Sequence, residues 1–310
     1  MDWQDHPEGT PPHVSRSAHG APFRLATGGG MPVLIAVPHA GRAYPEALRN
    51  RMRAPDVTAL RLEDRYVDVL AEGAAEATGA ALLVADAPRA MIDLNRAEDD
   101  VDWSMIAGHS PGRPARASSV NRRARGGLGL IPRRLTGLGE IWRERTRHAE
   151  LEARLATVHR PYHAALAATL ESIRDRWGAA LLIDLHSMPP LAAARTGAVP
   201  AEFVVGDRFG ASCARSIVTR TLAFLDANGR ATAHNRPYAG GFVLDRHAAP
   251  ARDIHAIQIE ICRSTYLDAR FDRPGPRAPA VTRLIANLVR HLGEDVALMG
   301  GRGPLPVAAE

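Results

Sequence analysis

Two histidines stand directly after apolar runs of the kind that form buried strands. His39 follows the run 31–37, and His186 closes the stretch 181–186 (LLIDLH). A neutral imidazole is the commonest metal ligand in proteins, and binding groups in parallel α/β sheets gather beyond the carboxyl ends of the strands. Asp184 lies two residues before His186, so both side chains share a strand face, and a carboxylate there can fix the imidazole tautomer. The alternative is a hydrogen-bonded histidine that ends a core strand.

The densest polar motif is the stretch 86–96 (DAPRAMIDLNR), which follows a strand expected at 81–85. If the strand continues, Asp93 and Asn95 share a face and Arg96 emerges beside them. This set suits a carboxylate that supports a metal ligand, an amide donor and an anion clamp. An Asp–Arg surface pair at a strand exit is the alternative.

An acidic residue stands in the last expected strand, 254–262 (IHAIQIEIC). Strand alternation places Ile257, Ile259 and Ile261 on one face and Gln258 and Glu260 on the other. Burying an unpaired carboxylate is costly, so we expect one of two arrangements for Glu260. Either it pairs with an arginine such as Arg263, or it is a catalytic base with a raised pKa.

The remaining pattern predicts one α/β domain at 31–295. Residues 1–30 lack periodicity and predict a disordered segment, and 296–310 predicts a flexible tail. A polar stretch without regular period predicts a long loop, with an Arg-rich insertion at about 105–139. Apolar spacing predicts helices at 57–78, 140–177 (broken near Pro161), 209–225 and 277–293, a strand at 203–205 and a glycine turn at 238–241.

Composition limits the partners and the chemistry. The net charge of +5 is uneven, because residues 113–147 hold ten arginines and two glutamates (10 − 2 = +8), which leaves 5 − 8 = −3 for the rest. The chain has no lysine, which excludes a lysine Schiff base and a P-loop lysine. The arginine segment has almost no aromatics for base stacking, so nucleic acid is not the expected partner.

The chain shows no sign of a membrane or redox role. No apolar run reaches the roughly 20 residues that span a bilayer, and no charged-then-apolar leader opens the chain, so we expect a cytoplasmic protein. Cys213 and Cys262 have no metal-site spacing and are expected to be buried thiols.

His159 and His163 stand four apart, but the zinc-protease pattern HExxH is absent there.

Five motifs occur in an order that resembles the N-formylglutamate amidohydrolases, zinc-dependent enzymes of histidine catabolism. The resemblance covers about residues 31–293. It implies a mixed, mostly parallel sheet flanked by helices on both faces, as in the zinc carboxypeptidases and aspartoacylases of the phosphorylase/hydrolase-like fold. The motifs are 38–41 (PHAG), 93–96 (DLNR), 184–187 (DLHS), 238–241 (YAGG) and 255–261 (HAIQIEI).

The resemblance also implies a ligand set for one Zn²⁺ per chain. His39 and His186 match the histidine ligands, and Asp64 is the best match to the carboxylate ligand, with Glu63 as its rival. Carboxypeptidase-like enzymes place a glutamate three residues after the first histidine, where this chain has Arg42. Asp93 resembles the carboxylate that orients the first histidine.

The same resemblance implies roles in catalysis. Glu260 matches the general base and Arg89 the arginine that stabilises the oxyanion, although Arg89 lies slightly closer to the DLNR motif than its aspartoacylase counterpart. Asn95 and Arg96 match the pair that grips a substrate carboxylate, and the turn with Gly240 and Gly241 lets the backbone approach a ligand closely.

These residues predict hydrolysis of an N-acyl amino acid. Two imidazoles and one carboxylate leave zinc an open position at which water can be activated. N-formyl-L-glutamate is the leading substrate, with formate and L-glutamate as products. The alternatives are a related deacylase or carboxypeptidase, and a non-catalytic binding protein that uses the Arg-rich segment. No oligomeric state is predicted.

Overall fold

The computed structural model describes residues 21–108, 124, 126–193 and 199–301. Within them the main sheet has the strand order β1-β3-β2-β8-β11-β9-β10. Strands β3, β2, β8 and β11 run parallel to one another, whereas β1 is antiparallel to β3 and β9 is antiparallel to β11. The predicted mixed, mostly parallel sheet is therefore confirmed. The strands are β1 (Phe23–Ala26), β2 (Val33–Val37), β3 (Ala81–Ala85), β8 (Ala180–Met188), β9 (Phe203–Gly206), β10 (Thr232–His234) and β11 (Ile254–Cys262).

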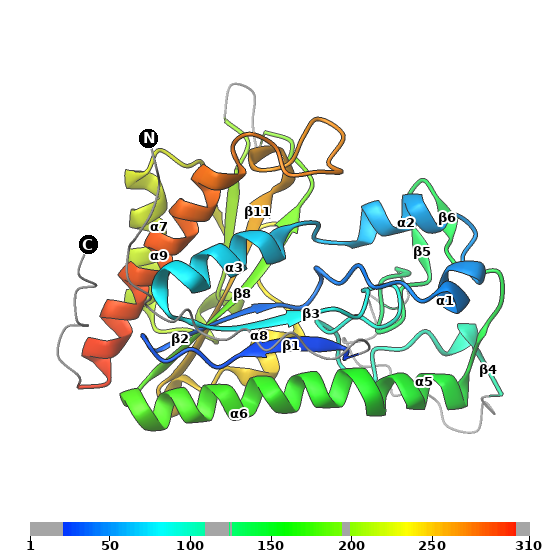
Figure 1. The fold of residues 1–310 in the computed structure, drawn as a ribbon, viewed down its shortest axis with the longest axis horizontal. Helices are drawn as coiled ribbons and strands as arrows, with labels where there is room; N and C mark the ends of the chain where they lie inside the picture. Colours follow the sequence, from blue (N-terminus) through cyan, green and yellow to red (C-terminus); the bar gives the residue numbers. More distant parts are fainter. Residues whose placement is uncertain (1–20, 109–123, 125, 194–198, 302–310) are drawn as a thin grey trace, which may run out of the picture.

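Helices cover both faces of the sheet (Figure 1). Alternate strand residues such as Ile183 and Ile257 join one buried cluster with α3, α7 and α9, while Leu182 and Ala256 join the other with α6 and α8. This alternation explains the unbroken apolar runs of β2 and β3. The helices are α1 (Glu46–Asn50), α2 (Pro55–Leu62), α3 (Val67–Thr78), α5 (His148–Arg154), α6 (Arg160–Trp177), α7 (Arg215–Ala227), α8 (Phe242–His247) and α9 (Ala278–Met299).

The helix expected at 57–78 is two helices, α2 and α3, with residues 63–66 between them. Glu63 is extended and Tyr66 has φ 59°. Tertiary hydrogen bonds override the continuous periodicity here, because the Asp64 N–H donates to the carbonyl of His39 (2.9 Å). The Arg263 guanidinium also donates to the carbonyls of Leu60 and Glu63 at the end of α2. The break frees Asp64 from a helix surface.

The helix expected at 140–177 also differs. It begins at His148, because 139–147 contain the short strands β6 (Gly139–Glu140) and β7 (Thr146–Arg147). No break occurs near Pro161, which stands in the first turn of α6, where a missing N–H costs least. A π-helical turn at Leu155–His159 joins α5 to α6 instead.

Both predicted ends of the domain need correction. Strand β1 lies inside the segment 1–30 that was expected to be disordered, and its four residues pair with β3 at the sheet edge. Helix α9 continues to Met299, so residues 296–299 are helical and not a tail. Residues 1–20 and 302–310 lie outside the described residues, as do residues 109–123 and 125 of the arginine-rich insertion.

The excursion between β3 and α5 has little regular structure where it is described. It contains the short strands β4 (Ile106–Ala107) and β5 (Arg134–Leu135), which pair with β7 and β6. Cys213 and Cys262 are buried free thiols, as predicted. Among the described residues, no helix has both the length and the apolarity to cross a membrane.

Candidate active site

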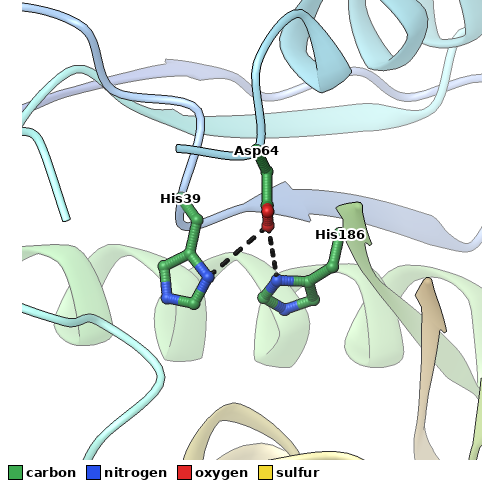
Figure 2. A group of neighbouring side chains, drawn as sticks. All are labelled: His39, Asp64 and His186. Atoms are coloured by element: carbon green, nitrogen blue, oxygen red, sulfur yellow. Dashed lines mark hydrogen bonds and ion pairs between the residues drawn. The ribbon is translucent and has the colours of Figure 1, made fainter. Parts of the chain in front are cut away.

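Three buried side chains from distant segments meet beyond the ends of the parallel strands. His39 follows β2, His186 lies near the end of β8, and Asp64 lies on the link between α2 and α3. Asp64 Oδ2 is 3.0 Å from His186 Nδ1 and 3.5 Å from His39 Nδ1 (Figure 2). One ligand atom from each residue lies within 4.8 Å of the others, so the group can hold a metal ion.

A carboxylate supports each histidine on the side away from Asp64. His39 Nε2 donates to Asp93 Oδ1 (2.7 Å), and His186 Nε2 donates to Asp184 Oδ2 (2.9 Å). These bonds fix a proton on each Nε2, so the Nδ1 atoms that face Asp64 are the nitrogens that would bind a metal once their protons are displaced. The donor chemistry therefore fits a divalent cation such as zinc.

The charges at the site follow from this crowding. Burial opposes the charge of His186, but Asp184 and Asp64 together raise its pKa well above the ordinary value. Burial also opposes ionisation of Asp64, yet its hydrogen bonds with His186 and His39 lower its pKa. The site thus keeps Asp64 as a carboxylate, the form that ligates metals.

The geometry distinguishes Asp64 from Glu63. Glu63 Oε2 faces Arg65 Nη1 (3.4 Å), outside the histidine group. Arg42, which stands where carboxypeptidase-like enzymes have a glutamate, donates to both oxygens of Asp68 (2.9 and 2.6 Å). The guanidinium of Arg42 cannot be a carboxylate ligand, and among the described residues it is the Asp64 carboxylate that lies with the two histidines.

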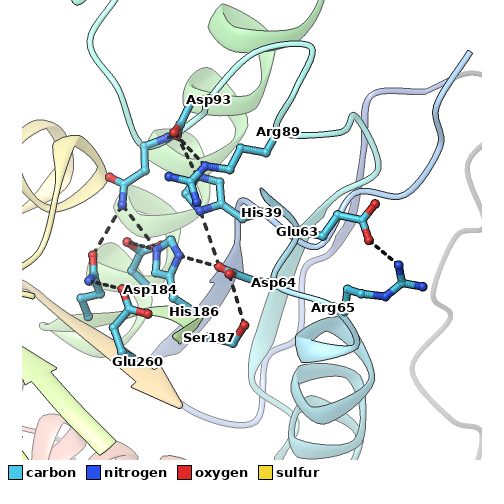
Figure 3. A network of polar contacts seen from close by, with 12 residues as sticks. His39, Glu63, Asp64, Arg65, Arg89, Asp93, Asp184, His186, Ser187 and Glu260 are labelled. Atoms are coloured by element: carbon cyan, nitrogen blue, oxygen red, sulfur yellow. Dashed lines mark hydrogen bonds and ion pairs between the residues drawn. The ribbon is translucent and has the colours of Figure 1, made fainter. Parts of the chain in front are cut away.

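Glu260 lies on the strand beside His186. The two residues are register partners on β11 and β8, and Figure 3 shows their side chains together. Gln258 Nε2 donates to Glu260 Oε1 (2.9 Å), and burial raises the pKa of Glu260 to about 7 against the opposing charge of His186. Arg263 is not its partner, because that guanidinium donates to Ser187 Oγ (3.1 Å) and to carbonyls of the α2 end. Glu260 thus has a raised pKa and no ion pair with an arginine among the described residues, and its role as a catalytic base stays a prediction.

The motif 93–96 is a chain of turns and not the strand exit that was expected. Asp93 Oδ1 accepts from the N–H of Asn95 (2.9 Å) as well as from His39, and Asp93 Oδ2 accepts from Arg89 Nε (2.9 Å). This local turn, typical of aspartate, brings the carboxylate and Asn95 to one side without strand alternation. The Nη groups of Arg89 make no further hydrogen bond within the described residues, and Arg89 lines the cavity.

Asn95 and the glycine turn are packed against each other. Asn95 Oδ1 accepts from the N–H of Val243 (2.9 Å). A Cβ on Gly241 would lie 2.4 Å from Asn95 Oδ1, so only glycine fits there without displacing the amide. Gly240 has φ +97°, which L side chains rarely adopt.

Arg96 is more engaged than its predicted role as a carboxylate clamp suggests. Its Nε donates to the carbonyl of Leu128 (2.9 Å) and its Nη1 to the carbonyl of Asn95 (2.7 Å). A guanidinium can hold a carboxylate with two parallel hydrogen bonds either through Nε and one Nη or through both Nη atoms. In Arg96 each of these pairs already includes a nitrogen that donates a hydrogen bond to a carbonyl. Arg96 lines the cavity as a fixed positive charge.

One cavity of about 560 Å³ is lined by His39, Asp64, His186, Glu260, Arg89, Asn95, Arg96, Gly240 and Gly241. Among the described residues its wall holds four arginines and two carboxylates, Asp64 and Glu260, which sum to 4 − 2 = +2. Sequence reasoning assigned no site role to several of these wall residues. Gln258 could have been predicted from the sequence, because it lies two residues before Glu260 and so shares a strand face with it. The wall residues without an earlier site role are Arg61, Gly126, Leu128, Ser187, Pro189, Pro237, Tyr238, Gln258 and Arg263.

His159 and His163, the two histidines that stand four residues apart, form hydrogen bonds with other groups of the protein. His159 Nε2 donates to the carbonyl of Arg96 (2.9 Å), and His163 Nδ1 is bonded to His247 Nε2 (2.9 Å). Both rings are fully buried behind the cavity wall, and neither is in its lining.

Comparisons with known proteins define the class of this site. A family model described as N-formylglutamate amidohydrolase matches residues 31–267. The N-formylglutamate deformylase of Pseudomonas putida is 32% identical over 253 residues, which cover 77% of this chain and 83% of that protein. The N-formylglutamate deformylase of Pseudomonas aeruginosa is 30% identical over 273 residues, which cover 85% and 93%.

A solved structure has the same fold. The crystal structure of N-formylglutamate amidohydrolase from Ralstonia eutropha JMP134 matches with a TM-score of 0.80 at 31% identity, and the match covers 90% of this chain and 99% of that one. The fold and the site thus define an enzyme of the amidohydrolase class. The chain belongs to the N-formylglutamate amidohydrolase family. The resemblance read from the motifs is confirmed, and the enzyme is favoured over the non-catalytic binding protein.

Proposed function

We propose that this enzyme hydrolyses N-formyl-L-glutamate to formate and L-glutamate with one zinc ion per chain. The observation that carries the proposal is the buried group of His39, Asp64 and His186 beside Glu260, which opens onto an arginine-rich cavity. The names of the two Pseudomonas relatives support the substrate. We further propose a fold related to the zinc carboxypeptidases, and a place in the cytoplasm and in histidine catabolism.

His39, Asp64 and His186 would hold the zinc ion, with Asp93 and Asp184 orienting the two imidazoles. When bound, zinc supplies Lewis acidity that activates water and polarises a carbonyl oxygen. A set of two imidazoles and one carboxylate is a common catalytic zinc site and keeps a coordination position open.

Glu260 is the proposed proton carrier. Its raised pKa, about 7, allows it to accept a proton from the attacking water near neutral pH and to donate it afterwards to the leaving nitrogen. Gln258 holds one Glu260 oxygen through its amide, so the carboxyl group keeps its direction during this exchange. The formyl carbon becomes formate and the nitrogen leaves as the amine of glutamate.

Positive side chains complete the site. Arg89, held by Asp93 through Nε, directs its remaining donors toward the negative charge that develops on the carbonyl oxygen. Asn95 and the turn with Gly240 and Gly241 contact the carboxylate of the amino acid, and Arg96 attracts that carboxylate through its fixed positive charge. An excess of two positive charges in the wall suits a substrate with two carboxylates, such as N-formyl-L-glutamate, over a neutral side chain.

The experiment combines metal analysis with a substrate panel. The purified protein should contain about one zinc per chain and release formate from N-formyl-L-glutamate. N-acetyl-L-glutamate and N-formyl-L-alanine, the controls for the acyl group and the side chain, should each react at least about ten-fold more slowly in kcat/KM, the effect of losing about 1.4 kcal/mol. Equal rates on all three compounds would contradict the proposed specificity, and activity without any metal would contradict the zinc assignment.

A further inference from the structure

Three buried histidines and a half-buried phenylalanine form a layer behind the cavity wall, which we call the histidine layer: His159, His163, His247 and Phe242. His159 ends the π-helical turn just before α6, His163 lies in the first turns of α6, and the other two come from α8. The Phe242 ring stacks on His159 (5.9 Å between centroids, 27°) and meets His163 edge-on (5.2 Å, 82°). His163 and His247 are stacked (5.2 Å, 16°) and hydrogen-bonded. None of the four lines the cavity.

His159 connects α6 to the segment that carries Asn95 and Arg96. Its Nε2 donates to the Arg96 carbonyl at 2.9 Å, and burial lowers its pKa, so the neutral ring keeps its proton on that nitrogen. A π-helical turn at Leu155–His159 ends at this residue. Such turns are rare and recur at functional sites, where they set the direction of a side chain.

The other half of the layer connects α6 to the glycine turn. Helix α8 begins with Phe242, directly after Gly241, and ends with His247. Contacts of α6 with Phe242 and His247 therefore fix both ends of α8. The two cavity segments also meet directly, because the Val243 N–H donates to Asn95 Oδ1 (2.9 Å).

We propose that His159 is a positioning residue, which holds Asn95 and Arg96 at the distance from Gly240 and Gly241 that substrate binding requires. This inference rests on the proposed function, because it assigns those segments to the substrate. We expect His159 to affect substrate binding and not the chemical step, because the histidine layer contacts neither the group of His39, Asp64 and His186 nor Glu260. The hydrogen bond to the Arg96 carbonyl is the contact that sets the position, with Phe242 filling the space behind it.

The test compares two replacements of His159. In His159→Gln the amide nitrogen can reproduce the Nε2–H donor, while His159→Leu keeps bulk without a donor. His159→Leu should raise KM for N-formyl-L-glutamate about ten-fold, and calorimetry should show the same rise in Kd for L-glutamate. A change of this size is expected when one buried hydrogen bond is lost. Its kcat and zinc content should stay within about two-fold of wild type. His159→Gln should restore KM. His291→Leu, a histidine of α9 on the other face, is the matched control and should change nothing.

Hydrogen–deuterium exchange of the substrate-free holoenzyme separates this inference from the proposed function. His159→Leu should speed exchange in peptides covering 93–96 and 241–243 and leave β8 and β11 unchanged. Phe242→Leu, the second variant if His159→Leu does not fold, should do the same. Equal KM in His159→Gln and His159→Leu, or uniform exchange in all variants, would overturn the positioning role. A wild-type enzyme that does not release formate would overturn the proposed function alone, because the exchange measurement needs no substrate.

Discussion

Glu260 and His186 are directly paired across the parallel strands β11 and β8. On each strand the same face changes from apolar to polar toward the carboxyl end, from Leu182 to His186 and from Ala256 to Glu260. Because side chains alternate with a period of two, a shift of one residue would place an isoleucine beside His186. The pairing of the strands therefore determines which chemical group stands beside the metal group.

Replacing Glu260 by glutamine tests its role in proton transfer. Glu260→Gln keeps the shape and can still contact Gln258, but it cannot accept a proton. We expect kcat on N-formyl-L-glutamate to fall by roughly 10² to 10⁴ with KM and zinc content little changed. Steady-state kinetics with metal analysis measures this. A variant with near wild-type kcat would make Glu260 a structural residue only.

The carboxylates behind the histidines should control metal affinity. Asp93→Asn and Asp184→Asn each replace the acceptor of an Nε2–H bond, so the imidazoles lose their fixed tautomer. We expect zinc affinity to fall by roughly 10- to 100-fold in competition with a chelator. Asp68→Asn, whose carboxylate pairs with Arg42 outside the group, serves as the control. Unchanged affinity in both variants would argue against metal binding through the Nδ1 atoms.

Gly241 should not tolerate a side chain. In Gly241→Ala the new Cβ would meet Asn95 Oδ1 at 2.4 Å, and one of the two cavity segments must move. We expect KM to rise about ten-fold or more, a cost of about 1.4 kcal/mol or above, while zinc stays bound. Gly293→Ala, where the nearest atom is the flexible Met31 Sδ at 3.2 Å, provides a comparison with the same change. If both variants keep the wild-type KM, the Asn95–Gly241 contact does not limit binding.

Buried histidines should make the protein sensitive to acid. Burial, together with neighbouring positive groups, lowers the pKa of His163 to about 2 and that of His247 to about 3. In the unfolded chain both titrate near about 6.5. Below that pH the unfolded state binds more protons, so the free energy of unfolding falls as pH decreases from about 6.5 toward about 3.

Each such histidine contributes a slope of at most about 1.4 kcal/mol per pH unit. His247→Gln removes one of them, and denaturant unfolding between about pH 7 and about pH 5 should show a shallower loss of stability than wild type. An equal slope in His247→Gln would mean that this pair does not stay neutral in the folded state.

Much of the site was predictable because strand ends are visible in the sequence. His39 and His186 end apolar runs, and Glu260 interrupts one, so all three were located without a structure. Asp64 was different. It lies within a continuous helical periodicity, and only contacts with His39 and Arg263, far away in the chain, break the helix around it. The family motif pointed to Asp64, and the local pattern did not.

Other features depend on tertiary contacts that carry no local signal. Strand β1 was missed because its four residues are only half buried and follow a segment rich in glycine and proline. The engagement of Arg96 with the carbonyls of Leu128 and Asn95 could not be read from its motif, since the partner loop has no periodicity. The π turn before α6 was likewise invisible, because its composition does not differ from that of an α-helix.

The positions of the three proposed metal ligands in the chain have a consequence for how the protein matures. His39, Asp64 and His186 are separated by 64 − 39 = 25 and 186 − 64 = 122 residues, and they meet only after β2 has paired with β8. Contacts between such distant segments form late, because long loops must close first. A nascent chain therefore has no complete set of these three side chains before residue 186 is synthesised, and the proposed uptake of zinc would report that the central sheet has assembled.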